Sequence, residues 1–496
     1  MSTFFGLDIA RKALSVSQKG IEVTGHNIAN ADTVGYSRQR LTTVSVQPAS
    51  ASGRFVSAGR EQAGGGVMIL SIDQIRSPFL DRQYRNENMR TSEWSIRSDH
   101  LNYVEGLFDE LSGTGLSDAL NRFAVSMNEL SKNPVNKEFR TNLLQTASNL
   151  ADTFGHFASQ LAEKQMEQDG EIVVTAGQIN DIADSIVDLN LQIAKYELSG
   201  QKANDLRDRR NLMLDNLSSL TAYTLDHTAE GSIQVRIGGE LLVDHDTARY
   251  LSAPQTVDNP IDGVPASLHA LTWEDSGEPV GITGGSLKAL IDLRDGDTSD
   301  RIGMPYLCAQ LDLLARGIAE SINAVHSTGW TFPADANGNV SNTGNPFFAT
   351  SDGSSVFTAS NFAVDPRIVQ DVYQIATSLV EIADGTQSGN NGNVLRMMDL
   401  FDSRNIPGIG SYNGFLDSLA GEIAVETAHS KNRLSGQEAL LESLGLQRQS
   451  ISAVSIDEEA TQLIRYQHSY AAAARLITAI DEALDILVNK TGIVGR

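Results

Sequence analysis

The chain has 496 residues, of which 41% are hydrophobic and 20% charged, and its formal net charge at pH 7 is −24. At roughly 150 residues per domain, this length predicts about three domains. The hydrophobic content excludes a wholly disordered chain, and the acidic charge argues against a general binder of nucleic acid or anionic membranes. The single cysteine, Cys308, excludes an internal disulfide framework and a cysteine-rich zinc site.

The first residues predict a long helix with two apolar sides. Asp8 and Arg11 stand where a cleaved signal peptide needs an uninterrupted apolar run, so no such peptide is expected. An apolar row with a seven-residue repeat consists of Leu7, Leu14, Ile21 and Ile28, and a row of small residues follows it at Ala10, Ser17, Thr24 and Ala31. A second apolar row, Ile9, Val16 and Val23, lies about 200° round the helix at ~100° per residue. Both sides of this helix therefore need a partner.

The interior of the chain alternates between helical and strand patterns. Residues 76–222 predict a helical rod domain, which residues 285–328 and 405–440 complete. Within it, the turn Ser131-Lys-Asn-Pro134 separates two helices.

Two β-rich insertions are expected to interrupt the helical rod domain. The first covers residues 223–284, where Ile233, Val235 and Ile237 alternate with polar residues ahead of Gly238-Gly239, a hairpin signal. The second covers residues 329–404, a loop and strand segment that is rich in Gly, Asn, Ser and Thr.

The last segment, residues 441–496, predicts a coiled-coil helix. Its apolar row repeats every seven residues at Ile456, Leu463, Tyr470, Ile477 and Leu484, and a second row follows at Tyr466, Ala473, Ile480 and Leu487. From 456 to 488 this helix would span about 50 Å. The pattern also fits an amphipathic helix docked on a globular core, but its presence at both ends favours pairing of residues 1–75, a helix and an extended arm, with residues 440–496.

Taken together, these patterns predict a mainly α fold with inserted β domains. We expect an elongated multi-domain rod with paired N- and C-terminal helices, a helical-bundle middle domain and outer β-rich insertions.

No motif has the spacing of a catalytic or metal site. Asp295, Asp297 and Asp300 begin like a calcium loop, but Tyr306 stands where that loop needs its last glutamate. His326 is expected to be a hydrogen-bonded structural residue, and Cys308 a small buried hydrophobe in an apolar helix. The sequence therefore predicts a protein that is not an enzyme and has no cofactor and no metal.

Distinctive motifs lie at both ends of the chain. The first runs Asn-Ile-Ala-Asn-Ala-Asp-Thr-Val-Gly-Tyr-Ser-Arg-Gln and contains Asn27, Asn30, Gly35 and Tyr36. The second comprises Ser-Ile-Asp-Glu-Glu-Ala from Ser455 and Arg-Tyr-Gln-His-Ser-Tyr-Ala-Ala-Ala-Ala-Arg from residue 465. These motifs resemble the terminal signatures of the bacterial flagellar axial proteins, which include rod, hook and hook-associated proteins.

The middle of the chain narrows the resemblance to the hook-associated members. Residues 285–294, 311–315 and 323–329 are similar to blocks of those members, and the length exceeds that of the rod proteins. Ala453 and Ser455 depart from the Gly and Asn expected before the last helix, which puts in doubt only the turn that enters it.

The resemblance implies a structural adaptor that stacks into a tube and joins hook to filament, with the terminal helices inside and the insertions outside. It implies as partners further copies of the chain, hook protein, a second hook-associated junction protein and an export chaperone at the C-terminal region, with no nucleic acid and no membrane. It also implies a place outside the cell, at the hook–filament junction, after type III export without a cleaved signal peptide. The two heptad rows that begin at Leu7 and Ile456 are then the candidate assembly residues.

Other interpretations stay open from the sequence alone. The chain could be another axial protein, such as hook protein or the second junction protein. It could also be a secreted hydrolase with its site in residues 221–284 or 330–400, although no spacing of His, Asp, Glu or Ser supports one. A third alternative is an adhesin-like β domain carried on a tube, which ligand binding by the isolated 221–400 fragment would reveal.

Overall fold

The structure is a computed structural model that describes residues 3–46, 64–108, 115–228, 231–261, 265–332, 343–382, 389–403 and 406–490. Its contacts divide the chain into two compact units. Unit 1 comprises Met1–Met89, Ile179–Tyr250 and Glu438–Arg496, and unit 2 comprises Arg90–Gln178 and Leu251–Gln437. Three long helices contribute residues to both units, namely α2 (Pro78–Leu107), α4 (Lys137–Glu197) and α10 (Tyr412–Ser452).

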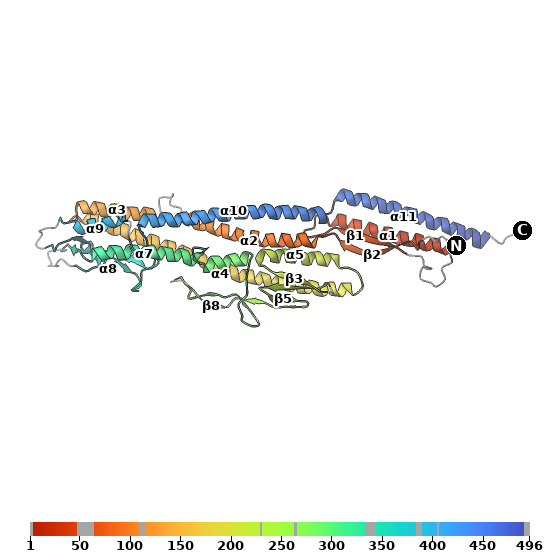
Figure 1. The fold of residues 1–496 in the computed structure, drawn as a ribbon, viewed down its shortest axis with the longest axis horizontal. Helices are drawn as coiled ribbons and strands as arrows, with labels where there is room; N and C mark the ends of the chain where they lie inside the picture. The colour runs from red at the N-terminus through yellow and green to blue at the C-terminus, as the bar shows by residue number, and fades with distance from the viewer. Residues whose placement is uncertain are drawn as a thin grey trace. The chain divides into compact units, whose positions relative to one another are not determined.

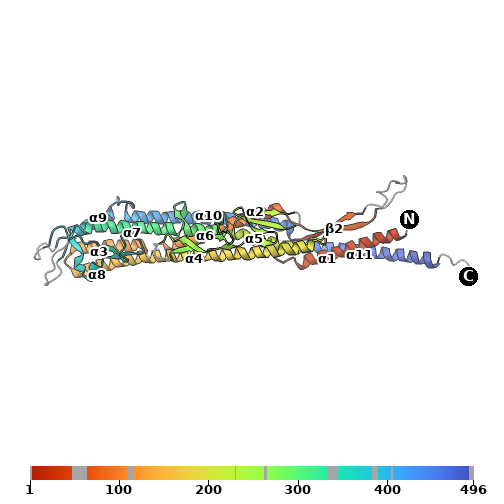
Figure 2. The same cartoon turned by 90° about the horizontal axis from the view of Figure 1, so that it is seen from below.

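Unit 1 contains both terminal helices. Helix α1 (Thr3–Ala29) packs along α11 (Ile456–Asp485), and the two lie side by side in Figures 1 and 2. A wider π-helical turn, η4 (Ile486–Lys490), follows α11. Strands β1 (Gln39–Ser45) and β2 (Val67–Gln74) form an antiparallel ribbon that contacts α1. Helix α5 (Asn204–Leu220) completes the helical part of this unit.

A four-stranded antiparallel sheet also belongs to unit 1. Its order is β3 (Thr224–His227), β4 (Ile233–Ile237), β5 (Glu240–Asp244) and β6 (Thr247–Ala248). Ile233, Val235 and Ile237 are buried and alternate with less buried neighbours, as the sequence pattern predicts. Gly238 and Gly239 both have positive φ, which the tight turn between β4 and β5 requires. The predicted hairpin is therefore confirmed.

Unit 2 is built around a hydrophobic core between helices. Its own helices are α3 (Leu116–Lys132), α6 (Ser286–Asp295), α7 (Met304–His326) and α9 (Gly392–Asp402). Helices α3, α7 and α9 surround the core together with the unit 2 parts of α2, α4 and α10. The predicted break near Ser131–Pro134 is confirmed, because α3 ends at Lys132 and α4 begins at Lys137.

The strands that the structure describes in unit 2 are short and paired two by two. The pairs are β7 (Leu251–Ser252) with β10 (Thr272–Trp273), β8 (Gln255–Asp258) with β9 (Ser267–His269), β11 (Asp297–Thr298) with β12 (Arg301–Ile302), β13 (Trp330–Thr331) with β16 (Ala376–Ser378), and β14 (Phe348–Thr350) with β15 (Phe362–Val364). A short helix, α8 (Pro366–Gln370), and a 3₁₀ turn, η3 (Val372–Gln374), lie between β15 and β16.

The second predicted insertion contributes to the core of unit 2. Phe347 and Phe348 are buried there and pack against Phe123 of α3, with ring centroids 5.8 Å apart in both pairs. The fold is thus mainly helical with small inserted sheets, as the sequence predicts. The five-segment division into domains stays a prediction, since the two compact units group the residues differently.

The residues that the sequence marked as structural lie in unit 2. Cys308 is 7% exposed, and burial raises the pKa of its thiol to about 12. His326 is fully buried, where Nδ1 donates to the carbonyl of Asn345 (2.8 Å) and Nε2 accepts from the amide of Ala376 (2.9 Å). Both interpretations are confirmed. Asp297 and Asp300 are exposed on the β11–β12 hairpin, in keeping with a solvated turn.

Candidate functional site: the junction of the terminal helices

The two terminal helices run antiparallel. Gly6 lies opposite Ile480, Gly20 opposite Tyr466, and Asn27 bonds to Glu459. From one pair to the next, the residue number increases along α1 by as much as it decreases along α11. One register therefore holds over most of the length of the pair.

Small residues on α1 bring the two helices close together. A Cβ atom placed on Gly20 would lie 2.6 Å from Cδ1 and 2.7 Å from Cγ of Tyr466, closer than real Cβ contacts. At Gly6 the corresponding distance to Ile480 Cδ1 is 3.3 Å. The small-residue row is also the buried one, since Ala10, Ser17 and Thr24 are at most 5% exposed. This face permits an approach that larger side chains would block.

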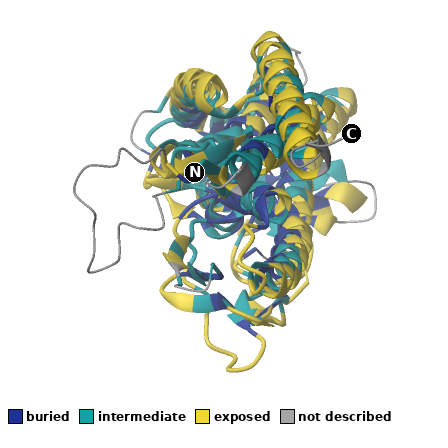
Figure 3. Cartoon of the chain, turned by 90° about the vertical axis from the view of Figure 1, so that its right-hand side faces the viewer, coloured by how far each residue is buried: buried dark blue, intermediate teal, exposed yellow. Residues whose placement is uncertain are grey.

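The predicted heptad residues border this contact instead of forming its centre. The row Leu7, Leu14, Ile21 and Ile28 is half-buried, as are Leu463, Ile477 and Leu484. Ile456 and Tyr470 are exposed, at 56% and 38%. Figure 3 shows most of the C-terminal helix, near the label C, coloured as exposed. The assembly role of these residues stays a prediction.

Asn27 joins the end of α1 to two other segments. Its Nδ2 donates to the carbonyl of Gln39 (2.9 Å) and to Oε2 of Glu459 on α11 (3.1 Å). Its Oδ1 accepts from the amide of Gln39 (2.9 Å) and from the Tyr36 hydroxyl (2.7 Å). Asn27 is 1% exposed, so it is a fully bonded buried amide.

The other residues of the N-terminal signature form the turn after α1. The amide of Asn30 donates to the carbonyl of His26 (3.1 Å) and ends the helix. Gly35 has a φ of 81°, a value that favours glycine. A Cβ atom at this position would lie 3.4 Å from the Cβ of Leu212 on α5. The pKa of Tyr36 is raised by burial and by the charges of Asp205, Asp208 and Glu459, so its hydroxyl stays a donor to Asn27.

Arg38 ties the same turn to the start of α11. Its Nε donates to Glu459 Oε1 and its Nη1 to Glu458 Oε2, both at 2.7 Å. Burial alone would lower the pKa of Arg38, but these two carboxylates raise it overall. The Ser455 hydroxyl accepts from the amide of Glu458 and caps α11. The departure from the family pattern at this position therefore keeps an N-cap.

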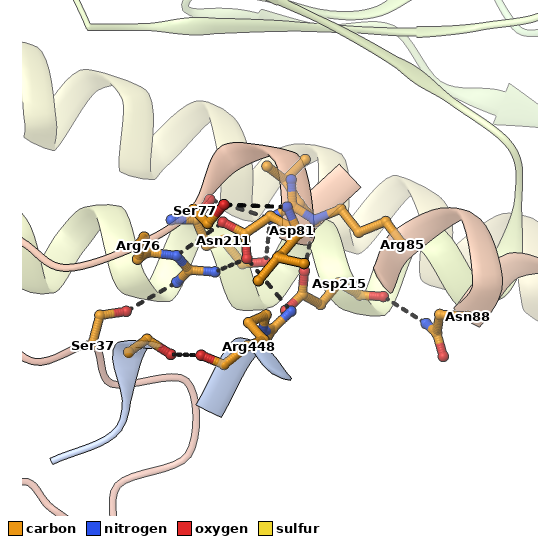
Figure 4. A network of polar contacts seen from close by, with 12 residues as sticks. Ser37, Arg76, Ser77, Asp81, Arg85, Asn88, Asn211, Asp215 and Arg448 are labelled. Carbon is orange, nitrogen blue, oxygen red and sulfur yellow. Dashed lines mark hydrogen bonds and ion pairs between the residues drawn. The ribbon is translucent and has the colours of Figure 1, made fainter. Parts of the chain in front are cut away.

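A network of buried ion pairs lies beneath this turn (Figure 4). Arg76, which follows β2, pairs with Asp81 of α2 (2.9 Å) and Asp208 of α5 (3.2 Å). The hydroxyl and amide of Ser37 both donate to Asp208 (2.7 and 3.0 Å). Because Ser37 lies in the short segment that leads from α1 to β1, this contact fastens the end of the N-terminal helix to α5.

Asp215 connects the network to α10. Its Oδ1 accepts from Arg85 Nε of α2 and its Oδ2 from Arg448 Nη2 of α10, both at 2.7 Å. The Arg448 guanidinium also lies over the ring of Tyr84, 4.3 Å from its centroid. Four residues later α10 ends at Ser452, whose carbonyl accepts from the amide of Arg38 (2.9 Å).

The network is electrically balanced and largely dry. It holds three arginines, Arg76, Arg85 and Arg448, and three aspartates, Asp81, Asp208 and Asp215. Burial raises the pKa of Asp208 despite its bonds to Ser37 and the charge of Arg76. Burial lowers the pKa of Arg76, but the bond to Asp81 and the nearby aspartate charges raise it overall. Such a cluster holds elements in one arrangement more than it adds net stability.

The sequence analysis identified the signature residues but missed this network. Asp208 and Asp215 stand seven residues apart on α5, and Asp81 and Arg85 four apart on α2. These spacings place each pair on one helix face. The same spacing is typical of a solvated charged face, so the pattern alone could not reveal burial.

The described residues contain neither a metal-ligand group nor a helix that could span a membrane. Among them, no group of three or more His, Cys, Asp or Glu side chains could hold a metal ion. None of the described helices combines the length and hydropathy that crossing a bilayer requires. The contacts described above hold the terminal helices α1 and α11 to α2, α5 and α10.

Comparison with known proteins agrees with this arrangement. The family described as "Flagellar hook-associated protein FlgK helical domain" matches residues 101–348, which is half of the chain. The chain belongs to the family of flagellar hook-associated proteins. Its ends match two further families, "Flagella basal body rod protein" at residues 7–36 and "Flagellar basal body rod FlgEFG protein C-terminal" at residues 447–490. It is therefore a structural axial component of the bacterial flagellum.

Relatives match the chain over its full length. Flagellar hook-associated protein 1 of Bacillus subtilis is 29% identical and covers 100% of both chains. The protein of the same name from Salmonella typhimurium is 24% identical over 97% of this chain and 98% of its own. The structure of the flagellar hook junction protein FlgK from Burkholderia pseudomallei has a similar fold, with a TM-score of 0.58 and 14% identity over 75% of this chain and all of that one.

Proposed function

We propose that the chain is an adaptor that joins hook to filament by stacking with copies of itself into a tube. The observation that supports this best is the apolar surface which the α1–α11 pair leaves uncovered. On α11, Ile464 is 54% exposed and Leu476 is 46% exposed. Single exposed apolar residues are ordinary, but several along one helix fit contact with other subunits.

The uncovered surface extends over more than one side of α11. Tyr466 faces α1 at Gly20, and Ile464 lies about 200° round the helix from it at ~100° per residue. We include Ile464 with the exposed heptad residues Ile456 and Tyr470 among the assembly contacts. The half-buried Leu463 would serve the helix pair within one chain as well.

The proposed neighbours follow from this role. Hook protein would lie on one side of the tube and a second hook-associated junction protein on the other. An export chaperone would bind the C-terminal end, where Ile486, Leu487 and Val488 are 51%, 51% and 75% exposed. Type III export would bring the chain outside the cell to the hook–filament junction, where it needs neither catalysis, nucleic acid nor a membrane.

Replacing Ile464 with Asp tests the assembly surface without disturbing the chain. Because Ile464 is exposed, the melting temperature of the purified protein should hardly move. Each assembled contact would lose about 1.5–3 kcal/mol of apolar burial, and it would also have to desolvate a carboxylate. Cells with this variant should be non-motile and should release unpolymerised flagellin. Gln178→Asp adds the same charge at an exposed polar position on α4, away from the terminal helices, and should preserve motility.

Electron microscopy of the purified chain mixed with hook fragments tests the function itself. We expect added density at one end of each fragment, and none with Ile464→Asp. Normal filaments from Ile464→Asp would rule out this surface. Failure of the wild-type chain to bind hook ends at all would count against the adaptor function.

A further inference from the structure

Unit 1 contains a cavity of about 1090 Å³ whose charge is opposite to that of the chain. It lies among the start of α2, the end of α4, helix α5 and strands β3 and β4. Two acidic side chains, Asp81 and Glu197, line it. The basic side chains that line it are Arg76, Arg82, Arg85, Lys202, Arg207 and Arg210. This concentration of cations stands out in a protein of net charge −24.

Four of these cations have carboxylate partners. Arg76 and Arg85 belong to the ion-pair network described above. Lys202 pairs with Asp73 (2.6 Å) and Arg207 with Glu197 (2.8 Å). Arg82 and Arg210, by contrast, form no ion pair with any described residue.

Arg210 is the unusual member of the set, because it is only 5% exposed. Its Nη1 donates to Asn190 Oδ1 (2.7 Å) and to the carbonyl of Gly231 (3.0 Å), both of which are neutral acceptors. Burial, with the neighbouring charge of Arg207, lowers the pKa of Arg210 to about 10, although the charge of Glu197 opposes this shift. Glu197 is itself paired with Arg207. A buried guanidinium whose hydrogen-bond acceptors are neutral is costly, and a further anion beside it would remove much of that cost.

We propose that this cavity binds an oxyanion, a phosphate or a carboxylate group, with Arg210 as the inner contact and Arg82 as the outer one. Guanidinium groups suit this ligand because their paired N–H groups match its oxygen atoms. Arg82 is exposed, so it can meet a ligand from solvent. The cavity exceeds the volume of a single phosphate and lies at the upper end of ordinary ligand pockets. It therefore also has room for several carboxylates on one chain.

Thermal unfolding of the full chain, titrated with sodium phosphate at constant pH and ionic strength, tests the proposal. Chloride provides the reference for general salt effects. We expect a saturable rise in melting temperature, as binding to the folded state requires. Arg210→Gln should weaken the apparent affinity at least tenfold, and Arg82→Gln should weaken it severalfold. Arg209→Gln removes an exposed charge from the same helix, outside the cavity, and should leave the affinity unchanged.

A second arm distinguishes the two sources of the oxyanion. The same titration is repeated with an acetylated, amidated tri-glutamate peptide. Saturable binding of phosphate identifies a free-anion site, and saturable binding of the peptide alone identifies a site for carboxylates of a protein chain. Should Arg210→Gln fail to fold, the exposed Arg82→Gln decides, and an unchanged affinity in that variant overturns the proposal. It is overturned equally if neither probe saturates, or if Arg209→Gln weakens binding as much as the cavity variants do.

Discussion

The close approach of α1 and α11 at Gly20 can be tested with a single methyl group. Alanine at an interior helix position is favoured over glycine by about 1 kcal/mol. At Gly20, however, the new Cβ would lie 2.6 Å from Cδ1 and Cε1 and 2.7 Å from Cγ of Tyr466. Because Cγ is bonded directly to the Tyr466 Cβ, rotating the ring about its own axis cannot relieve this contact. The helices must separate, or Tyr466 must leave its position.

The expected free energy follows from these opposing effects. Overpacking of this kind costs about 1–3 kcal/mol, so Gly20→Ala should be neutral to destabilising by about 2 kcal/mol. Gly25 provides the matched control, because it is exposed on the same helix and a Cβ there has no heavy atom within 4 Å. Gly25→Ala should therefore stabilise α1 by the full ~1 kcal/mol.

Native-state hydrogen exchange of the full chain, resolved to the amides of α1 and α11, measures the free energy of opening this pair. Gly20→Ala should leave exchange unchanged or speed it in both helices, and Gly25→Ala should slow it in α1. In a Tyr466→Ala background the clash is absent, so Gly20→Ala should then stabilise, and the double-mutant cycle isolates the contact. If Gly20→Ala slows exchange in the unmodified background as Gly25→Ala does, the helices are not as close as described.

The other predictions concern single side chains. Asp215→Asn removes the partner of two arginines and should destabilise α2 and α5 by about 3–5 kcal/mol in hydrogen exchange, whereas Asp118→Asn breaks only an exposed pair and should cost under about 1 kcal/mol. Burial lowers the pKa of His326 to about 4. Between pH 6.5 and 4 the unfolded state therefore binds more protons than the folded state. The free energy of unfolding should fall by about 3 kcal/mol over this range as the pH is lowered. His326→Gln should remove that part of the pH dependence of urea unfolding. The Cys308 thiol, with a pKa of about 12, should react with iodoacetamide at pH 8 about a thousandfold more slowly than after unfolding, and equal rates would contradict its burial.

Periodicity predicted most helices because burial repeats with the helical turn. The hairpin at Gly238-Gly239 and the break after Lys132 could likewise be predicted, since local backbone preferences decide them. The N-terminal signature pointed to residues whose structural roles are now explicit, such as the four hydrogen bonds of Asn27. The hairpin and the helix break depend on neighbours in the sequence, whereas Asn27 also bonds to Glu459 on α11.

The sequence shows a row of small residues beside the apolar row of α1, and the structure places Ala10 of that row at the α1–α11 contact. Apolar periodicity gives weight to large side chains, and so the candidate assembly residues came from the row of Leu7 and Leu14. Close packing between helices is instead set by small residues, and Ala10 and Gly20 carry little hydrophobic signal. The role of Phe347 and Phe348 in the core of unit 2 escaped for another reason, because a glycine- and asparagine-rich context is typical of an exterior loop.

The ion-pair network explains how the terminal pair can be firmly attached although so much of α11 is exposed. Surface ion pairs weaken with salt because mobile ions screen them. The aspartates of this network are at most 7% exposed and Arg85 is 8% exposed, so few ions can reach the charges between Ser37 and Arg448. Raising the salt concentration should therefore leave the attachment of α1 to α5 nearly unchanged, whereas the loss of any one charged partner leaves another buried and unpaired. This attachment therefore tolerates changes in salt concentration but not substitution of its charged residues. Such an attachment suits a protein whose terminal helices must keep a fixed position relative to the rest of unit 1 in an assembly.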